Sequence, residues 1–182
     1  PGTKEIYCNY GYLLLSLIIE KKTGKDYFQY LKTAVLNKIG VSEAKVWKTV
    51  QSPRPADEVA TESWDLGESA VNVTSNILVP HVYGGDKMIK EVAAASCGLA
   101  SSAHAMVQFI HQRAVWGTGG RAANSARTGS TPGSSTLAAS RGDGIDWAYA
   151  INTRDFIDPA SKPLEKLGNE ITAFLNSNAA SI

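Results

Sequence analysis

The chain has 182 residues, a formal net charge of +1 and 43% hydrophobic residues, which suffices for one domain with a buried core or for most of one. A balanced charge without a basic stripe argues against a nucleic-acid partner. The longest apolar stretch, residues 13–19, contains Ser16 and is too short to span a bilayer. Two cysteines, Cys8 and Cys97, do not make a disulfide framework. No signal peptide is visible. Because the sequence begins with Pro1-Gly2 and not with methionine, we expect a processed, trimmed or truncated product.

Two helices are predicted near the N-terminus. The spacing of apolar residues predicts a helix over residues 10–22 that stops at Gly24, a residue suited to a helix C-terminus. Asn9 stands just before this helix, where its side-chain oxygen can cap the first turn. Asp26 has the position of a capping residue for a second helix, predicted over about residues 27–37.

Residues 42–95 are loop-rich, with several prolines and paired glycines, and short alternating pieces such as Val71, Val73 and Ile77 give only weak strand signals. A third helix is predicted after Ser101 or Ser102, either of which can cap it. Its buried face repeats apolar residues at helical spacing: Met106, Val107, Phe109, Ile110 and Ala114.

The last third of the sequence predicts an antiparallel sheet followed by a helix. Strands are expected over residues 126–131, 134–140 and 145–153, with a tight turn between the second and third strands. From Ser161 onward, apolar residues return at helical spacing and predict a C-terminal amphipathic helix that lies on the sheet. These patterns indicate an α/β fold of the α+β sandwich type, with a helical region and an antiparallel sheet flanked by a C-terminal helix.

The histidines do not show the spacing of a metal site. His104 and His111 are seven residues apart on the third predicted helix, which is two turns rather than the one turn that a metal-binding pair uses. His81 lies in the loop-rich region. We therefore expect no metal ligand among the three.

Three short phrases of the sequence carry recognisable chemistry. Tyr7-Cys8-Asn9 is followed by Tyr10-Gly11-Tyr12-Leu13-Leu14 at the entry to the first helix. Gly98-Leu99-Ala100-Ser101-Ser102-Ala103 opens the third helix, and Arg127-Thr128-Gly129-Ser130 precedes Thr131-Pro132-Gly133 on the first strand of the sheet. Together these phrases resemble the serine β-lactamase and penicillin-binding-protein superfamily, most closely its class C β-lactamase and esterase branch.

The resemblance implies catalytic roles for three residues. Tyr7 would serve as general base and acid, held near a lysine of the family's first motif. Asn9 would donate a hydrogen bond to the acyl oxygen or amide of the substrate and would orient that lysine. The backbone N–H of Ser130 would form half of an oxyanion hole. No metal ion or organic cofactor is implied.

The resemblance also implies that Arg127, Thr128 and Gly129 bind substrate along the strand that borders the active site. The Arg127 guanidinium would fix a substrate carboxylate, and Gly129 would let the substrate lie close to the backbone. The family has lysine or histidine where this chain has Arg127. Because arginine does not lose its proton, a proton-shuttle role does not carry over, whereas carboxylate binding does. The alternative is that Arg127 is a solvated charge on an edge strand.

The family's first motif, Ser-x-x-Lys, holds the nucleophile and precedes the second motif in chain order. Only six residues precede Tyr7, and none of them is serine. Ser42-Glu43-Ala44-Lys45 has the residue types of the Ser-x-x-Lys motif. However, it follows the second motif and lacks the apolar helix that would depress the pKa of Lys45. We therefore reject it. The resemblance implies that residues 1–182 form the C-terminal portion of a single domain, with residues 1–115 mainly helices and loops and residues 116–182 strands and a C-terminal helix.

The function expected from the resemblance is that of part of a serine acyl hydrolase. Such an enzyme acts on ester, amide or β-lactam carbonyls through a covalent acyl-enzyme. The alternative is a catalytically inactive fragment or a binding module with the same fold. Expected partners are a small-molecule or peptide acyl substrate and either an N-terminal fragment that carries Ser-x-x-Lys or a second copy of the chain, with no nucleic acid and no membrane span. The family is mostly exported, so a periplasmic or secreted location is expected.

Overall fold

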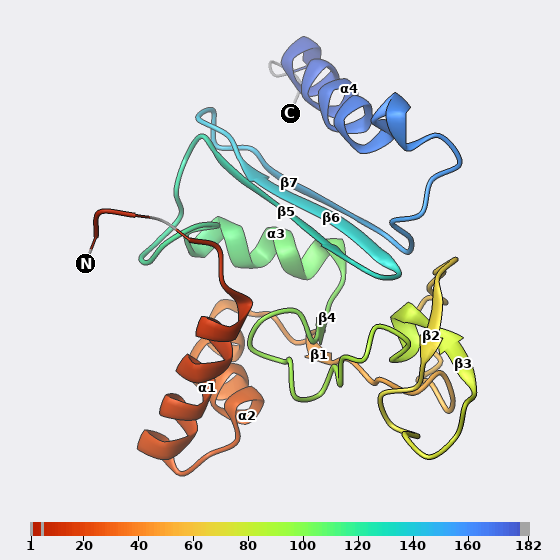
Figure 1. Cartoon of the computed structure of the whole chain (residues 1–182). Coiled ribbons are helices and arrows are strands. Elements are labelled where there is room, and N and C mark those ends of the chain that lie inside the picture. The colour runs from red at the N-terminus through yellow and green to blue at the C-terminus, as the bar shows by residue number, and fades with distance from the viewer. Residues whose placement is uncertain (1, 5, 179–182) are drawn as a thin grey trace.

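The computed structural model describes residues 2–4 and 6–178. Helices and short strands of the first half lie below a three-stranded antiparallel sheet that has a helix on each face (Figure 1). The mixture of helices and antiparallel strands confirms the α+β fold predicted from the sequence. Within the described ranges, no helix is both long enough and apolar enough to cross a membrane.

The first helix, α1 (Asn9–Thr23), ends as predicted. Gly24 adopts a φ of 65°, and its N–H donates to the carbonyl of Glu20. The predicted cap at the other end is wrong. Asn9 lies inside the first turn, so it does not have the non-helical backbone of a capping residue. Cys8 occupies the cap position without a side-chain hydrogen bond, and the Asn9 amide oxygen accepts from the Tyr7 hydroxyl instead.

The second helical stretch begins at its predicted cap, because Asp26 accepts a 3.0 Å hydrogen bond from the N–H of Gln29. Only α2 (Tyr27–Leu31) is α-helical, and the chain continues as a π turn, η1 (Lys32–Leu36), and a 3₁₀ turn, η2 (Asn37–Ile39). The Thr33 hydroxyl donates to the carbonyls of Gln29 and Tyr30 at 2.8 and 3.3 Å, where it competes with the backbone ladder. This competition for the helical carbonyls occurs where the helix widens into the π turn η1.

The loop-rich middle of the chain contains two short antiparallel pairs. β1 (Lys45–Val46) pairs with β4 (Leu99–Ala100), and β2 (Leu66–Glu68) pairs with β3 (Leu78–Pro80). The strand signals at Val71 and Val73 are wrong, because these residues lie in the turns that connect β2 to β3. A 3₁₀ turn, η3 (His81–Tyr83), follows β3 and buries Val82.

The three-stranded sheet has the order β5-β6-β7, with β5 (Ser125–Thr131), β6 (Ser134–Ser140) and β7 (Asp146–Ile151). All three predicted strands are confirmed, with end differences of two residues or fewer. Among the described residues β5 is an edge of this sheet, because it pairs with β6 alone. A helix covers each face, α3 (Ala103–Gln112) on one side and α4 (Pro163–Asn178) on the other (Figure 1). A 3₁₀ turn, η4 (Pro159–Ser161), precedes α4.

The core of the molecule forms where α3 meets the helical region. Ala105 packs with Leu36, Ile39 and Val41, and each of these side chains is nearly inaccessible to solvent. The α3 helix starts at the predicted cap, since Ser102 accepts from the N–H of Ala105 at 3.0 Å. The other side of α3 packs on β6 and β7, so one helix joins the first half of the chain to the sheet.

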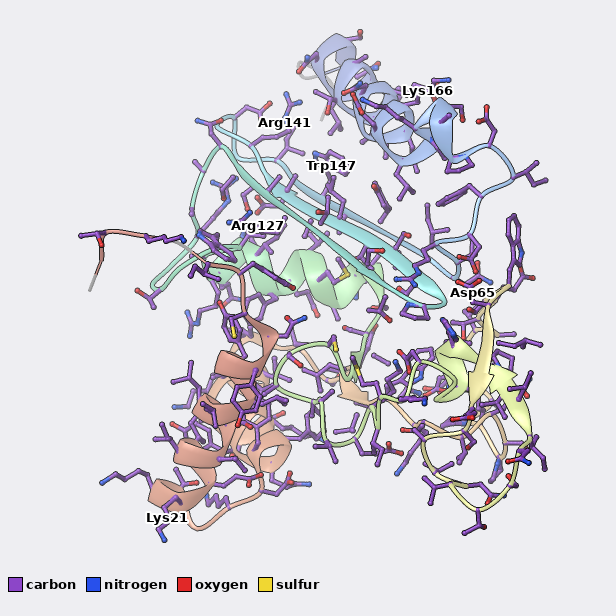
Figure 2. The ribbon with its side chains drawn as sticks, in the orientation of Figure 1. Lys21, Asp65, Arg127, Arg141, Trp147 and Lys166 are labelled. Carbon is purple, nitrogen blue, oxygen red and sulfur yellow. The ribbon has the colours of Figure 1, made fainter. Side chains whose placement is uncertain are left out.

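The two faces of β7 are both covered, which differs from a strand with one solvated face. Trp147 and Tyr149 point toward α4, and Figure 2 shows Trp147 between the sheet and that helix. Asp146 belongs to the opposite face, and its side chain is only 2% exposed. It accepts from Arg121 Nε at 3.0 Å and lies 2.8 Å from Nδ1 of His111. The carboxylate therefore ties α3 and the loop after it to the sheet.

The Asp146 carboxylate should make stability depend on acid. Burial alone would raise the pKa of Asp146, but hydrogen bonds from Arg121 and His111 outweigh burial and lower it. A lowered folded pKa contributes stability at pH values above the unfolded value of about 4, and this contribution is lost as pH falls through the folded pKa.

We therefore expect Asp146→Asn to destabilise the chain at pH 7 and to lose this disadvantage progressively below about pH 4. Urea unfolding at pH 7, 5 and 3 would measure the difference between the variant and the unchanged chain. Asp65→Asn is a matched control, because the Asp65 side chain is 68% exposed. A difference for Asp146→Asn that stayed constant down to pH 3 would contradict the role assigned to its charge.

The turn between β5 and β6 depends on a glycine for two separate reasons. Gly133 has a φ of 78°, a left-handed conformation that side chains disfavour. A Cβ atom there would also overlap the Val82 Cγ2 atom and lie 3.1 Å from Thr61 Cβ. Because Val82 is almost fully buried in η3, the turn is held tightly against the middle of the chain.

Two alanine substitutions separate these reasons. Gly144 has a φ of 94° but no neighbour within 4 Å of the added carbon. Gly144→Ala should therefore cost about 1–2 kcal/mol from the backbone alone. Gly133→Ala should cost about 1–3 kcal/mol more, because Val82 must also shift. Equal losses in the free energy of unfolding would show that the contact with Val82 is unimportant.

The surface is larger than the mass of the chain predicts. Its accessible area is 11472 Å², whereas a compact monomer of 19.4 kDa exposes about 8,500 Å². Part of the excess is apolar and lies on α1, where Leu15, Leu17 and Ile18 are each more than half exposed. These side chains point to different sides of the helix, so α1 is apolar around much of its circumference.

Candidate active site

The Tyr7-Cys8-Asn9 phrase forms a small polar unit at the start of α1. Cys8 is extended, with φ −151° and ψ 100°, and this places the side chains on either side of it close together. The Tyr7 hydroxyl donates to Asn9 Oδ1 at 2.9 Å. Because the oxygen of Asn9 is used, its amide NH₂ keeps two hydrogens available for a ligand.

The second part of the site is the edge strand β5. Thr128, Gly129 and Ser130 are all exposed there. A Cβ atom at Gly129 would lie 2.6 Å from the Thr136 hydroxyl oxygen on β6, so the pairing of the two strands itself favours glycine at this position. The close approach to substrate predicted from the sequence is therefore not the only reason for a glycine here.

A cavity of about 610 Å³ brings these two parts together. Tyr7 and Asn9 line it from α1, and Thr128, Gly129 and Ser130 line it from β5. Five of the six residues predicted for the site thus share one cavity. Further walls come from the residue after β1, the segment before α3, the turn after β5 and the end of β7, with Trp47, Lys90, Cys97, Ser101, Pro132 and Arg154 among them.

Arg127 is the one predicted site residue that does not line this cavity. Its guanidinium lies 3.5 Å from the centroid of the Trp116 ring, a cation–π contact. Trp116 follows α3 and is half exposed. Figure 2 places Arg127 on the sheet. The sequence offered two roles for Arg127, a carboxylate reader or a solvated charge, and neither includes this stacked arrangement.

Two cationic residues of the cavity were not identified from the sequence. The Lys90 side chain is 3% exposed, and its Nζ atom lies 2.5 Å from an oxygen of Asp86, four residues earlier in the sequence. Such a buried charge requires a partner, and the i, i+4 spacing was the available signal. Arg154 follows β7, is exposed and had no local signal, because only the fold brings it to the cavity.

No group of three or more His, Cys, Asp or Glu side chains in the described part of the chain is placed to hold a metal ion. His104 contacts Glu43, and His111 contacts Asp146. Both cysteines are free thiols. The polar groups that line the cavity include hydroxyl, amide and cationic groups.

Comparison with known proteins assigns the family. A family model described as Beta-lactamase matches residues 1–161. The chain belongs to the Beta-lactamase family. Penicillin-binding protein 4* of Bacillus subtilis (strain 168) is 37% identical over 60 residues, which cover 33% of this chain and 13% of that protein. The resemblance to this superfamily that the motifs indicated is confirmed.

Solved structures support the same fold. A D-amino acid amidase from Ochrobactrum anthropi SV3 superposes with a TM-score of 0.58 at 15% identity, over 95% of this chain and 60% of the amidase. A D-stereospecific amidohydrolase from Streptomyces sp. gives a TM-score of 0.54 at 17% identity, over 84% of this chain and 52% of that structure. The chain thus spans little more than half the length of these Beta-lactamase-like structures.

The phrase Ser42-Glu43-Ala44-Lys45 does not resemble a nucleophile site in the structure. It begins in a loop and enters β1, and Ser42 does not line the cavity that contains Tyr7. The Lys45 ammonium lies 2.9 Å from Asp57, and this hydrogen bond raises the pKa of Lys45. A raised pKa keeps the amine protonated, whereas a lysine that activates serine requires a lowered one.

The isolated chain should therefore not be acylated at Ser42. We expect its intact mass to stay unchanged after incubation with a fluorescent penicillin and with a fluorophosphonate. The chain denatured beforehand supplies the background of non-specific labelling. A stoichiometric adduct that disappears in Ser42→Ala would overturn the rejection of this serine.

Proposed function

We propose that this chain supplies the tyrosine and edge-strand side of a serine acyl hydrolase that acts on ester, amide or β-lactam carbonyls through a covalent acyl-enzyme. The observation that carries the proposal is the shared cavity, which gathers Tyr7, Asn9 and residues 128–130 from two distant parts of the chain. The nucleophilic serine and its lysine would come from a segment outside these 182 residues. The chain would then be the C-terminal portion of a single domain, helical and loop-rich over 1–115 and sheet-bearing over 116–182.

In the proposed reaction, Tyr7 first gives its hydroxyl proton to the lysine of the nucleophile segment. The serine oxygen then bonds to the substrate carbonyl carbon while the serine proton passes to the Tyr7 phenolate. Tyr7 then returns the proton to the leaving group as the bond to that group breaks, which leaves the acyl-serine ester. Without the nucleophile segment, the Tyr7 hydroxyl donates to Asn9. When that segment is present, Tyr7 would exchange this partner for the lysine. The free Asn9 amide hydrogens would bind the acyl group, and the N–H of Ser130 would stabilise the oxyanion.

The structural neighbours favour amide substrates of modest size. The amidase from Ochrobactrum anthropi SV3 was solved in complexes with L-phenylalanine amide, L-phenylalanine and D-phenylalanine. A cavity of about 610 Å³ has room for ligands of that size. We extend the proposal to small-molecule or peptide acyl substrates. An exported location, periplasmic or secreted, is proposed on the family resemblance alone.

The uncovered surface supports a partner for the chain. Tyr7 is 78% exposed and α1 is apolar on several sides, which is unusual for a helix of a stable monomer. We propose that the nucleophile-bearing segment covers this region, and self-association would cover it otherwise. The intact masses in purified material would separate these cases, because a second polypeptide carrying Ser-x-x-Lys supports the enzyme.

A catalytically inactive fragment or binding module is the second candidate. It is favoured by one observation, that the match to Ser-x-x-Lys inside this chain lies outside the cavity and keeps its lysine charged. Such a protein would bind acyl compounds in the cavity without turning them over. Restoring a nucleophile-bearing segment and measuring turnover therefore distinguishes the two candidates.

In the restored complex, Tyr7→Phe should lower kcat/KM for a p-nitrophenyl ester by about 10²–10⁴-fold, because it removes the proton carrier. Tyr10→Phe is the matched control. Tyr10 lies on α1 and is 65% exposed, but it does not line the cavity. Unchanged kcat/KM in Tyr7→Phe would contradict the proposed mechanism, whereas equal losses in both variants would indicate damage to α1.

A further inference from the structure

The connection between β2 and β3 is exposed but carries no charge. None of residues 69–80, which lie between Glu68 and His81, has an ionisable side chain. Four large apolar side chains of this stretch are at least half exposed: Val71, Val73, Ile77 and Leu78. Exposed surfaces normally stay soluble through charged side chains, so this one needs another kind of cover.

The strands of the hairpin do not bury this surface themselves. β2 and β3 form a sheet of two strands, so in the described part of the chain each strand keeps one free edge. Natural edge strands are protected by charges, by proline or by a covering group. Pro80 is the one proline between residues 66 and 80. The hairpin therefore lacks part of the protection that exposed edges usually have.

A modification motif lies at the centre of this stretch. Asn72-Val73-Thr74 has the residue types of an N-glycosylation acceptor, Asn-x-Thr with x other than proline, and all three residues are exposed. The chain has nine asparagines, and only Asn72 is followed two positions later by serine or threonine. A glycan at this position would be a bulky and solubilising cover for the uncharged connection.

The hydrogen bonds of Asn72 leave one of its polar groups unused. Its N–H donates to the Ser69 hydroxyl at 3.1 Å, and its carbonyl accepts from the N–H and the hydroxyl of Ser75 at 3.4 and 3.2 Å. Its side-chain oxygen accepts from the Thr74 hydroxyl at 3.3 Å. No hydrogen bond engages its amide nitrogen among the described residues. The nitrogen that receives a glycan thus belongs to an exposed amide whose oxygen is already held.

We propose that Asn72 is an N-glycosylation site, modified when the chain passes through a secretory pathway whose oligosaccharyltransferase reads Asn-x-Thr. This inference rests on the proposed export of the protein and not on the proposed hydrolase activity. The donor is an oligosaccharide carried on a polyprenyl diphosphate.

In the transfer, the Asn72 amide nitrogen bonds to the anomeric carbon of the sugar. The bond between that carbon and the diphosphate oxygen breaks, and the diphosphate leaves with the electron pair. One amide proton passes to a base of the transferase. Residues 69–80 do not line the cavity that contains Tyr7, so a glycan on Asn72 is compatible with an open candidate site.

The test expresses the full 182-residue chain behind a cleavable signal peptide in yeast, so that it enters a secretory pathway whatever its natural location. We expect slower electrophoretic migration that peptide-N-glycosidase reverses, with conversion of Asn72 alone to aspartate in the digested peptides. Asn72→Gln should abolish the shift. Thr74→Val should also abolish it, because valine keeps the shape and loses the hydroxyl, whereas Thr74→Ser should retain it.

Asn76→Gln is the matched control, because Asn76 lies in the same exposed connection but has Leu78 two positions later. It should keep the shift. The proposal is overturned if the secreted chain carries no glycan, or if the glycan persists in Asn72→Gln or in Thr74→Val. Failure of turnover in the restored complex, or of export in the cells that make the protein, would count against the proposed function or location and not against Asn72 as an acceptor.

Discussion

The packing of α3 between the sheet and the helical region fixes where the site can form. Ala105 and Ile110 are each no more than 3% exposed, and α3 contacts β6 and β7 on one side and the core around Leu36 on the other. A short helix that buries residues toward two layers sets the distance between those layers. Because α1 and β5 belong to different layers, the width of the cavity between Tyr7 and Gly129 follows from this packing.

The walls of the cavity come from segments that are far apart in the sequence, and hydrogen bonds between loops hold them. Asn152 and Asp155 attach the end of β7 to residues 60 and 64, and the turn at Gly133 rests on Val82. None of these contacts uses a titratable side chain that lines the cavity, because they join Asn152 and Asp155 to backbone groups and place a glycine against buried methyl groups. The titratable groups that remain in the cavity can therefore serve a ligand without loosening the frame.

Periodicity and turn chemistry predicted most of the fold. The strands of the sheet, the end of α1 at Gly24 and the caps at Asp26 and Ser102 depend on neighbours in sequence, so local rules apply to them. The cap at Asn9 was wrong, because a competing local partner, the Tyr7 hydroxyl, takes its oxygen. The burial of Asp146 could not be predicted, since Arg121 and His111 reach it from separate segments.

Some residues of the candidate site could likewise be predicted from local sequence, and others could not. Short motifs identified the site residues at the start of α1 and on β5, because these residues are adjacent or nearly adjacent in the sequence. Trp116 and Arg154 needed the tertiary structure, since Arg154 belongs to the cavity only through the path of the chain after β7, whereas Lys90 had its spacing from Asp86 as a signal. Arg127 shows the limit of a motif, which specifies a residue type at a position but not the ring on which its side chain rests.

The close contact between Gly133 and Val82 has a consequence for how this chain can change over many generations. The two positions lie fifty-one residues apart in the printed numbering, yet they share one small volume. A larger side chain at either position requires a smaller one at the other, and the left-handed backbone limits the replacements at 133 to glycine and, less readily, asparagine. Substitutions in the loop that carries Val82 are thereby restricted by the hairpin. Among descendants of this sequence, these two positions should therefore drift together rather than independently.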